Sequence, residues 1–226
     1  METTFSDNRI DMPLYQRRIG RKIFLGLLGV GAAGVASNTL LSPVVRSVRG
    51  AVLPVSGFTI YTVAPIPDFH PATWRLTVGG LVDHKLSLSY HDLLNLPSAT
   101  TVRNYQCVTG WVVPHCEWQG VSLQTLARLA GARPGAQFIN FYSMDGVYSE
   151  SLRLPGQAFK SDVMLGYYLN RKPLAREQGA PLRLVVPEMY GYKYAKWIDR
   201  VEFSDRQEVG YWEQNGYTID AYLGTE

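Results

Sequence analysis

Short runs in which apolar and polar residues alternate, separated by glycine and proline, fill residues 51–226. This pattern predicts β-strands, because successive side chains of a strand point to opposite faces of a sheet. The strands that we expect are Trp74–Val82, Ser87–Ser89, Thr100–Tyr105, Gln137–Tyr142, Leu182–Val186 and Trp197–Phe203. Strands of this length, joined by loops, restrict the chain to architectures that are based on sheets.

The expected helices are few and short. The pattern predicts one helix at Tyr90–Leu96 and another at Leu123–Ala130, with Ser122 as its N-cap and Gly131 at its end. Two further segments are Ala51–Pro71, expected to be extended, and Leu152–Phe159, expected to be a loop or a short helix. Several strands with few helices predict an α+β domain dominated by sheet.

Residues 1–50 differ in kind from the rest of the chain. A basic cluster ending at Arg21 and Lys22 precedes an apolar run of about 14 residues, short for a membrane-spanning helix but typical of an export signal. The segment resembles twin-arginine export signals, with Lys22 in place of the second arginine. We therefore expect an export signal or membrane anchor at residues 1–50, with a buried helix as the alternative. The domain at residues 51–226 is then expected in the periplasm or on the outer face of the cytoplasmic membrane.

Charge is distributed unevenly between these two parts. Residues 1–50 carry seven Lys/Arg and three Asp/Glu, whereas residues 51–226 carry fifteen and sixteen, a net charge of −1 for the domain. A domain that binds nucleic acid needs an excess of basic side chains to neutralise phosphates. We therefore expect no nucleic-acid partner.

Cys107 is the candidate for chemistry in the domain. It directly follows the strand predicted at Thr100–Tyr105, and a strand end holds a side chain rigidly. A thiolate is a good ligand for a soft, high-valent metal. Local spacing alone also allows a buried structural cysteine, or a cysteine hydrolase that uses one of the four histidines. With Cys116 as the only other cysteine, the chain has too few thiols for a disulfide scaffold or a four-thiolate zinc site.

Five motifs, in order, resemble the molybdopterin-binding catalytic domain of the sulfite oxidase superfamily. They are Trp74–Val82, Tyr105–Trp111 with Cys107, Trp118–Leu123, Gly179–Pro187 and Gly191–Trp197. The similarity runs from about Phe58 to Tyr217. The order and spacing of the five motifs, more than any single motif, make the resemblance specific. The resemblance implies a sulfite-oxidase-type fold, in which mixed β-sheet dominates and the helices are short.

The resemblance also implies a cofactor, Mo-molybdopterin. One molybdenum per chain would be held by the dithiolene of one molybdopterin and by the Cys107 thiolate. The residues that match cofactor-binding positions of the family are Tyr61, Thr62, Cys107, Ser143, Gln178, Arg183, Lys193, Ala195 and Lys196. Arg183 and Lys196 are expected to meet the pterin and its phosphate, which cations bind well. Lys193 stands where many members have arginine, and a solvated surface charge is the alternative for each of the three.

The positions expected near the substrate depart from the sulfite-oxidising members. Those members carry arginine in an Arg-Asn-His triplet, which here reads Tyr61-Thr62-Val63, and another arginine where this chain has Val112. Sulfite is a dianion, and without these arginines its lost hydration is poorly replaced. We therefore expect an organic or peptidyl S-oxide or N-oxide as substrate, as in exported bacterial reductases that lack the same arginines. An aromatic, near-neutral funnel is expected at Trp111–Val113.

Two further expectations complete the hypothesis. Asp145 or Tyr148 is expected to donate a proton to the departing oxygen, although a plain hairpin turn at Asp145 is the alternative. The sequence has no haem motif, no Gly-x-Gly-x-x-Gly and no cysteine set for an iron–sulfur cluster, so electrons are expected from a separate haem membrane subunit or cytochrome. The aromatic residues of Gly210–Tyr217 are expected to cap the sheet or to form a docking surface.

The sequence thus predicts a molybdenum-dependent oxidoreductase that transfers an oxygen atom in a two-electron step. The alternatives are a sulfite dehydrogenase-like enzyme and a non-catalytic binding module that keeps the fold.

Overall fold

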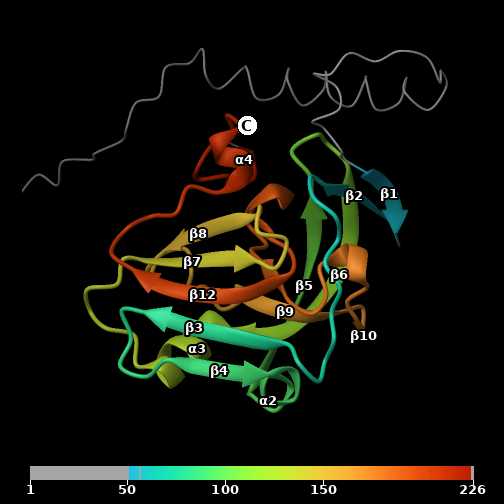
Figure 1. The fold of residues 1–226 in the computed structure, drawn as a ribbon. Helices are drawn as coiled ribbons and strands as arrows, with labels where there is room; N and C mark the ends of the chain where they lie inside the picture. Colours follow the sequence, from blue (N-terminus) through green and yellow to red (C-terminus); the bar gives the residue numbers. More distant parts are fainter. Residues whose placement is uncertain (1–50, 56, 225–226) are drawn as a thin grey trace, which may run out of the picture.

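A computed structural model describes residues 51–55 and 57–224, which form two five-stranded sheets and a two-stranded hairpin (Figure 1). The expected export segment, residues 1–50, lies outside the described residues. The strands are β1 (Ala51–Val55), β2 (Phe58–Thr62), β3 (Arg75–Gly80), β4 (Leu86–Ser89), β5 (Ser98–Gln106), β6 (Val112–Ser122), β7 (Phe138–Ser143), β8 (Ser149–Arg153), β9 (Met164–Leu169), β10 (Lys172–Pro173), β11 (Arg183–Val185) and β12 (Ile198–Ser204). The helices are α2 (Tyr90–Leu94), α3 (Leu123–Ala130) and α4 (Tyr211–Gln214), with 3₁₀ turns η2 (Arg176–Gln178) and η3 (Gly191–Lys193).

The first sheet has the strand order β4-β3-β12-β7-β8. Strand β12 runs parallel to β3 and antiparallel to β7, so the sheet is mixed. Its strands show the expected alternation: Leu76 and Val78 of β3 are buried, whereas Arg75 and Thr77 are exposed. The apolar side chains on the inner face form part of the core.

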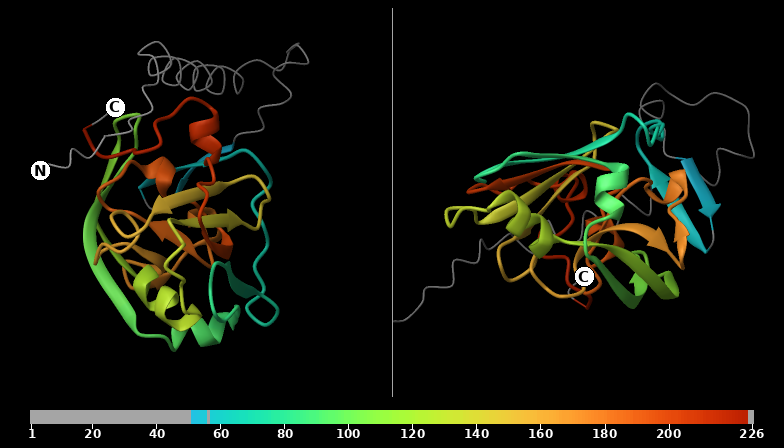
Figure 2. Two further views of the ribbon diagram at one scale, coloured as in Figure 1. Left: turned by 90° about the vertical axis from the view of Figure 1, so that its left-hand side faces the viewer. Right: turned by 90° about the horizontal axis from the view of Figure 1, so that it is seen from below.

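The second sheet has the order β10-β9-β6-β5, with β11 also paired to β9, and all of these pairs are antiparallel. Strands β5 and β6 form a long hairpin whose connection is residues 107–111. Figure 2 shows the first sheet apart from the second, with the β1–β2 hairpin beside the second sheet. This arrangement places Cys107 at the tip of the β5–β6 hairpin.

Helix α3 begins and ends as its sequence predicts. The Ser122 hydroxyl accepts a hydrogen bond from the Thr125 backbone N–H at 3.1 Å, the usual N-cap contact. Gly131 ends the helix with φ of +64°, a left-handed conformation that glycine adopts at little cost. The buried face of α3 includes Leu123 and Leu126. Within the described residues, no helix combines the length and the apolar character needed to cross a bilayer.

The α+β class, with sheet dominant and helices short, is confirmed. Four strands were not expected, namely β6, β8, β9 and β10. Part of the segment expected as a loop or short helix belongs to β8, which ends at Arg153, and turns follow as far as Phe159. The extended lead-in forms the β1–β2 hairpin and then an irregular stretch.

Candidate active site

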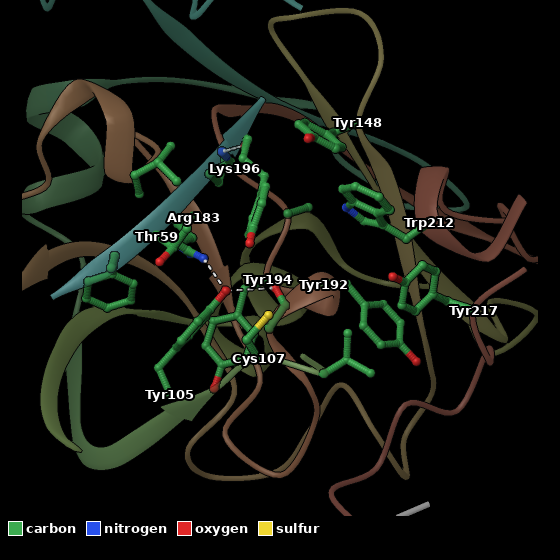
Figure 3. A pocket seen from close by; sticks show the side chains of 16 residues that line it. Thr59, Tyr105, Cys107, Tyr148, Arg183, Tyr192, Tyr194, Lys196, Trp212 and Tyr217 are labelled. Carbon is green, nitrogen blue, oxygen red and sulfur yellow. Dashed lines mark hydrogen bonds between the residues drawn. The ribbon is translucent and has the colours of Figure 1, made fainter. Parts of the chain in front are cut away.

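An open pocket of about 640 Å³ lies around Cys107 (Figure 3). It is lined by Phe58, Thr59, Ile60, Tyr61, Tyr105, Cys107, Val108, Tyr148, Arg183, Gly191, Tyr192, Tyr194, Ala195, Lys196, Trp212 and Tyr217. The lining therefore combines β2, the end of β5, β11, η3 and α4.

Cys107 stands in the tight turn of the β5–β6 hairpin. Its backbone N–H donates to the Trp111 carbonyl at 2.9 Å, and its carbonyl accepts from the Gly110 N–H at 3.0 Å. Gly110 has φ of +99°, which a residue with a Cβ would adopt only with strain. The Thr109 hydroxyl donates to Sγ at 3.2 Å. Burial raises the pKa of the Cys107 thiol, and the hydrogen bond from Thr109 opposes that shift.

Arg183 is held as a fixed positive charge at one end of the pocket. Its Nη1 donates to the Gln178 carbonyl at 3.0 Å and its Nη2 to the Tyr105 hydroxyl at 3.4 Å. Four rings surround the guanidinium at 5.2–5.9 Å from their centroids: Phe58, Tyr105, Trp118 and Tyr194. Stacked rings stabilise a guanidinium that is removed from water, so the charge is preorganised.

Lys196 is the second cation of the pocket. Its Nζ donates to the Tyr61 carbonyl at 2.6 Å and lies 4.1 Å from the centroid of the Trp197 ring. Trp197 has φ of +57°, and its indole N–H donates to the Arg176 carbonyl at 2.7 Å, which holds this unusual backbone in place. Burial and, to a lesser degree, the charge of Arg183 together lower the pKa of Lys196 to about 7.

The opposite side of the pocket is aromatic. Figure 3 shows Tyr192, Trp212 and Tyr217 grouped on one side of Cys107, with Arg183 and Lys196 on the other. The Tyr192 and Tyr217 rings lie 5.0 Å apart, and the Trp212 ring lies 5.7 Å from Tyr217 and 6.3 Å from Tyr148. Cys107 therefore separates a cationic end from an end without charged side chains among the described lining residues.

Six of the residues expected from the sequence line this pocket: Tyr61, Cys107, Tyr148, Arg183, Ala195 and Lys196. Sequence reasoning missed most of the aromatic side. Tyr192 stood inside a motif that was already recognised, next to Lys193, and Tyr217 ended the region of similarity. Trp212 belongs to the aromatic segment Gly210–Tyr217, which was expected to cap the sheet or to form a docking surface and not to line the pocket.

The other expected residues are outside the lining. The Thr62 hydroxyl bonds to the Ala64 carbonyl, and the Ser143 hydroxyl accepts from the Asp145 N–H at 3.3 Å. Gln178 accepts from the Ala175 N–H through its side chain at 3.0 Å and supports Arg183 through its carbonyl. Lys193 points away and bonds to two buried glutamates.

Asp145 and the segment Trp111–Val113 do not have the roles in the pocket that the sequence led us to expect. Asp145 lies in the β7–β8 turn, where its Oδ1 accepts from the backbone N–H groups of Val147 at 2.9 Å and Tyr148 at 3.0 Å. This is the turn role that the sequence left open for Asp145. The funnel expected at Trp111–Val113 is not part of the described lining, because Val112 and Val113 begin β6 and Trp111 packs 5.4 Å from the Tyr105 ring.

The donor set fits a phosphorylated pterin with a thiolate-bound metal. Two buried polar atoms of the lining, Arg183 Nε and the Tyr194 hydroxyl, have no hydrogen-bond partner among the described residues. Buried donors are normally satisfied, so a bound polar group is the expected partner. Arg183 and Lys196 supply positive charge for a phosphate, and Cys107 supplies a sulfur ligand. Among the described residues, no group of three His, Cys, Asp or Glu side chains forms a separate metal site.

Comparison with known proteins gives the same assignment. Residues 63–212 match the family described as the oxidoreductase molybdopterin binding domain. The chain is 34% identical over 164 residues to the uncharacterized oxidoreductase YuiH of Bacillus subtilis, covering 72% of this chain and 81% of that protein. It is 30% identical over 164 residues to the protein-methionine-sulfoxide reductase catalytic subunit MsrP of Campylobacter jejuni, covering 65% of this chain and 54% of that protein.

A solved structure shares the fold. The sulfane dehydrogenase SoxCD from Paracoccus pantotrophus superposes with a TM-score of 0.63 at 21% identity, covering 92% of this chain and 56% of that chain. The chain thus spans about half the length of the sulfoxide reductase subunit and of the SoxCD chain.

Proposed function

This chain belongs to the oxidoreductase molybdopterin binding family of the sulfite oxidase superfamily, and from that premise we propose that it reduces a neutral organic or peptidyl S-oxide or N-oxide. Membership makes it a molybdenum-dependent oxidoreductase with a molybdopterin cofactor. In the proposed reaction the oxide accepts two electrons and two protons, its oxygen bond breaks, and the products are the reduced compound and water. The similarity to a protein-methionine-sulfoxide reductase supports this direction.

The cofactor would be held at the cationic side of the pocket. Cys107 would bind the molybdenum, Lys196 and Arg183 would bind the pterin and its phosphate, and Tyr61 and Ala195 would contact it. When bound, the cofactor supplies a metal that changes oxidation state in two-electron steps. The chain's own part is to orient the groups and to keep this end of the pocket free of water, which strengthens each charge interaction.

The observation that carries the proposal is the uncharged aromatic side of the pocket. Arg183 and Lys196 are the only cations among the described lining residues. Arg103 is paired with Asp162 at 3.3 Å and Arg153 with Asp220, and neither arginine lines the pocket. Rings of this kind bind an apolar or polarizable group such as a thioether carbon frame, whereas a dianion requires several charged donors.

Tyr148 would supply a proton. Its ring lines the pocket, 6.3 Å from Trp212, and burial raises the pKa of its phenol, with Asp145 adding to the shift. The phenol is protonated at neutral pH, and because a raised pKa makes it a weaker acid, the support for this role is the place of Tyr148 in the pocket lining and not its acidity.

Electrons would come from a separate protein, either a haem membrane subunit or a small cytochrome. The related sulfoxide reductase is named a catalytic subunit, which supports a partner. Export through a signal at residues 1–50 belongs to the same proposal, and the basic cluster before the apolar run is what supports it.

Metal analysis together with a dye-linked assay tests the function. We expect one molybdenum per chain, reduction of organic or peptidyl sulfoxides with an artificial electron donor, and little sulfite oxidation. Each missing charge-assisted hydrogen bond costs about 1.5–3 kcal/mol, so two missing arginines should weaken sulfite by on the order of 10² to 10⁴-fold. Absence of molybdenum after expression with the cofactor would favour the non-catalytic module. Fast sulfite turnover at micromolar substrate would favour the sulfite dehydrogenase.

A further inference from the structure

Three ionisable side chains are buried together just outside the pocket. Lys193 Nζ donates to Glu213 Oε1 at 2.8 Å and also bonds to Glu150 Oε1. The side chains of all three residues are 2% exposed. They come from three elements that are far apart in the sequence: Lys193 from η3, Glu150 from β8 and Glu213 from α4. The cluster therefore joins these elements through charge-assisted hydrogen bonds.

The charges within this cluster are nearly balanced. Burial raises the pKa of Glu150 well above its ordinary value, and Glu213 adds to the shift, although Lys193 opposes it. Burial alone would lower the pKa of Lys193, but the two carboxylates together raise it. Lys193 is therefore charged at neutral pH, and the raised pKa of Glu150 favours the protonated form of that carboxyl group, which limits the net charge of the dry site.

The backbone next to the cluster leaves space for the carboxyl groups of Glu150 and Glu213. A Cβ at Gly210 would lie 2.3 Å from Glu213 Oε2, 3.0 Å from the Ser149 carbonyl oxygen and 3.1 Å from Glu150 Oε2, so a larger residue there would have to displace the carboxyl groups of the cluster. Gly210 is the N-cap residue immediately before α4, and it provides no side-chain cap. A helix of four residues without a cap is not stable by itself. The position of α4 must therefore come from tertiary contacts, of which the Glu213 bond to Lys193 is one.

Each element in the cluster carries an aromatic residue of the pocket or directly follows one. Tyr192 precedes Lys193, Trp212 precedes Glu213, and Tyr148 stands two residues before Glu150. Adjacent residues of a short helical turn point in different directions, so one can line the pocket while the next points into the cluster. We call the set Tyr148, Tyr192, Trp212 and Tyr217 the aromatic wall.

We propose that Lys193, Glu150 and Glu213 are positioning residues that hold the aromatic wall at the separation which the substrate requires. Among the residues that the structure describes, no side-chain hydrogen bond or ion pair links the cluster to Arg183, Lys196 or Cys107, so the cluster acts through α4, η3 and β8. The inference rests on the proposed function only in taking the aromatic wall as the surface that contacts the substrate.

Glu213→Ala tests the proposal in the full-length, cofactor-loaded protein. This change removes the bond from α4 but leaves Lys193 and Glu150 as a neutral buried pair, so the two sheets are expected to stay folded. We expect the molybdenum content to be unchanged, amide hydrogen exchange in residues 211–217 to become at least tenfold faster, and KM for an organic sulfoxide to rise at least fivefold with kcat within twofold.

Two matched variants accompany it. Glu213→Gln keeps an oxygen that accepts from Lys193, and it is expected to restore both exchange and KM to within twofold of the wild type. Asp205→Ala removes a carboxylate from an exposed position ahead of α4 and is expected to change neither quantity.

The outcomes separate this proposal from the proposed function. If the wild-type enzyme reduces no oxide, the proposed function fails, and the exchange rates alone then decide whether the cluster holds α4. Unchanged exchange in residues 211–217 of Glu213→Ala overturns the proposal. Faster exchange with unchanged KM also overturns it, because the position of the aromatic wall would then not matter to the substrate.

Discussion

Lys196 places its amino group where water has little access. Its Nζ contacts the Tyr61 carbonyl and the Trp197 ring, and burial lowers its pKa to about 7. In the unfolded chain the pKa of a lysine is about 10.4. Between these two values the unfolded chain binds a proton that the folded protein does not bind. The stability of the cofactor-free protein should therefore rise with pH in this window.

Lys196→Met should remove this pH dependence. From pH 6 to pH 9, the free energy of unfolding of the cofactor-free wild type is expected to rise by on the order of 2–3 kcal/mol more than that of the variant. Urea titrations at four pH values measure the difference, with the exposed residue in Lys85→Met as a control. Parallel curves for wild type and Lys196→Met would contradict the assignment of a buried, readily deprotonated lysine.

The two cysteines allow a paired test of metal binding. Cys107→Ser is expected to lose nearly all turnover, because a hydroxyl is a poor replacement for a soft thiolate ligand, whereas the dithiolene and the pterin contacts of Arg183 and Lys196 should still hold the molybdenum. Cys116 is fully buried in the core, and its thiol donates to the Val113 carbonyl at 3.4 Å. Cys116→Ser keeps that donor, so we expect full molybdenum content with a loss of about 1 kcal/mol in stability. Steady-state turnover, elemental analysis and thermal unfolding check both variants, and full turnover in Cys107→Ser would remove the ligand assignment.

A motif predicted which segments reach the pocket, but not the direction of every side chain within them. Arg183 and Lys196 were expected from the sequence and line the pocket together. Lys193 belongs to the same motif as Lys196, but η3 turns its side chain toward Glu150 and Glu213. The sequence does not show this direction, because both glutamates approach from other elements and their pairing depends on the tertiary fold.

At the scale of elements, the β7–β8 hairpin contains both candidate proton donors, Asp145 and Tyr148, and their contacts indicate different roles. Asp145 Oδ1 accepts two backbone N–H groups of the turn, a contact that an amide oxygen can replace. Asp145→Asn should therefore keep turnover within about threefold and lower stability by about 0.5–1 kcal/mol. If Asp145 were the proton donor, the Asn variant would instead lose most of its turnover.

Tyr148→Phe is the companion change in the same hairpin. It keeps the ring that packs on Trp197 and Trp212 but removes the hydroxyl. If Tyr148 donates the proton, kcat for an organic sulfoxide should fall by about 10²-fold or more, with molybdenum content unchanged. Steady-state kinetics together with metal analysis measure this, and a kcat equal to that of the wild type would exclude Tyr148 as the donor.

The elements that the sequence predicted are those with a clear period or a clear cap. Strand β3 alternates and α3 has Ser122 and Gly131 at its ends, and both were expected. Strand β9 was missed because five of its six residues are buried, so apolar residues do not alternate with polar ones. Strand β6 was missed because Pro114 interrupts its pattern near the irregular pairing opposite Asn104.

At the scale of the whole molecule, the sheets and the pocket have different sources of stability. Residues such as Phe141, Val201 and Trp118 are fully buried in the core of the sheets. The pocket instead collects charged and aromatic side chains from β2, the end of β5, β11, η3 with the segment that follows it, and α4. The sequence predicted the sheet class and the cofactor side of the pocket. It did not predict that α4 forms the opposite side, because that contact joins segments about 100 residues apart.

This difference predicts how the protein responds to loss of its cofactor. Arg183 is already held by Gln178, Tyr105 and four rings, so the pocket should be largely formed without a ligand. Cofactor-free protein, made in a host that does not synthesise molybdopterin, is therefore expected to keep both sheets. A bound ligand stabilises the folded state by mass action, so the cofactor-free protein should melt at a lower temperature.

Amide hydrogen exchange should show which segments lose protection when the cofactor is absent. In the cofactor-free protein, we expect faster exchange in residues 107–111 and 191–197, which line the cationic and thiol side, and unchanged exchange in β3, β7 and β12. The sheets owe their protection to hydrogen-bonded strands packed on an apolar core, and these contacts do not involve the cofactor. If β3, β7 and β12 also lost protection, the cofactor would be required for folding of the whole domain, and the pocket could not be a preformed site on an independently stable pair of sheets.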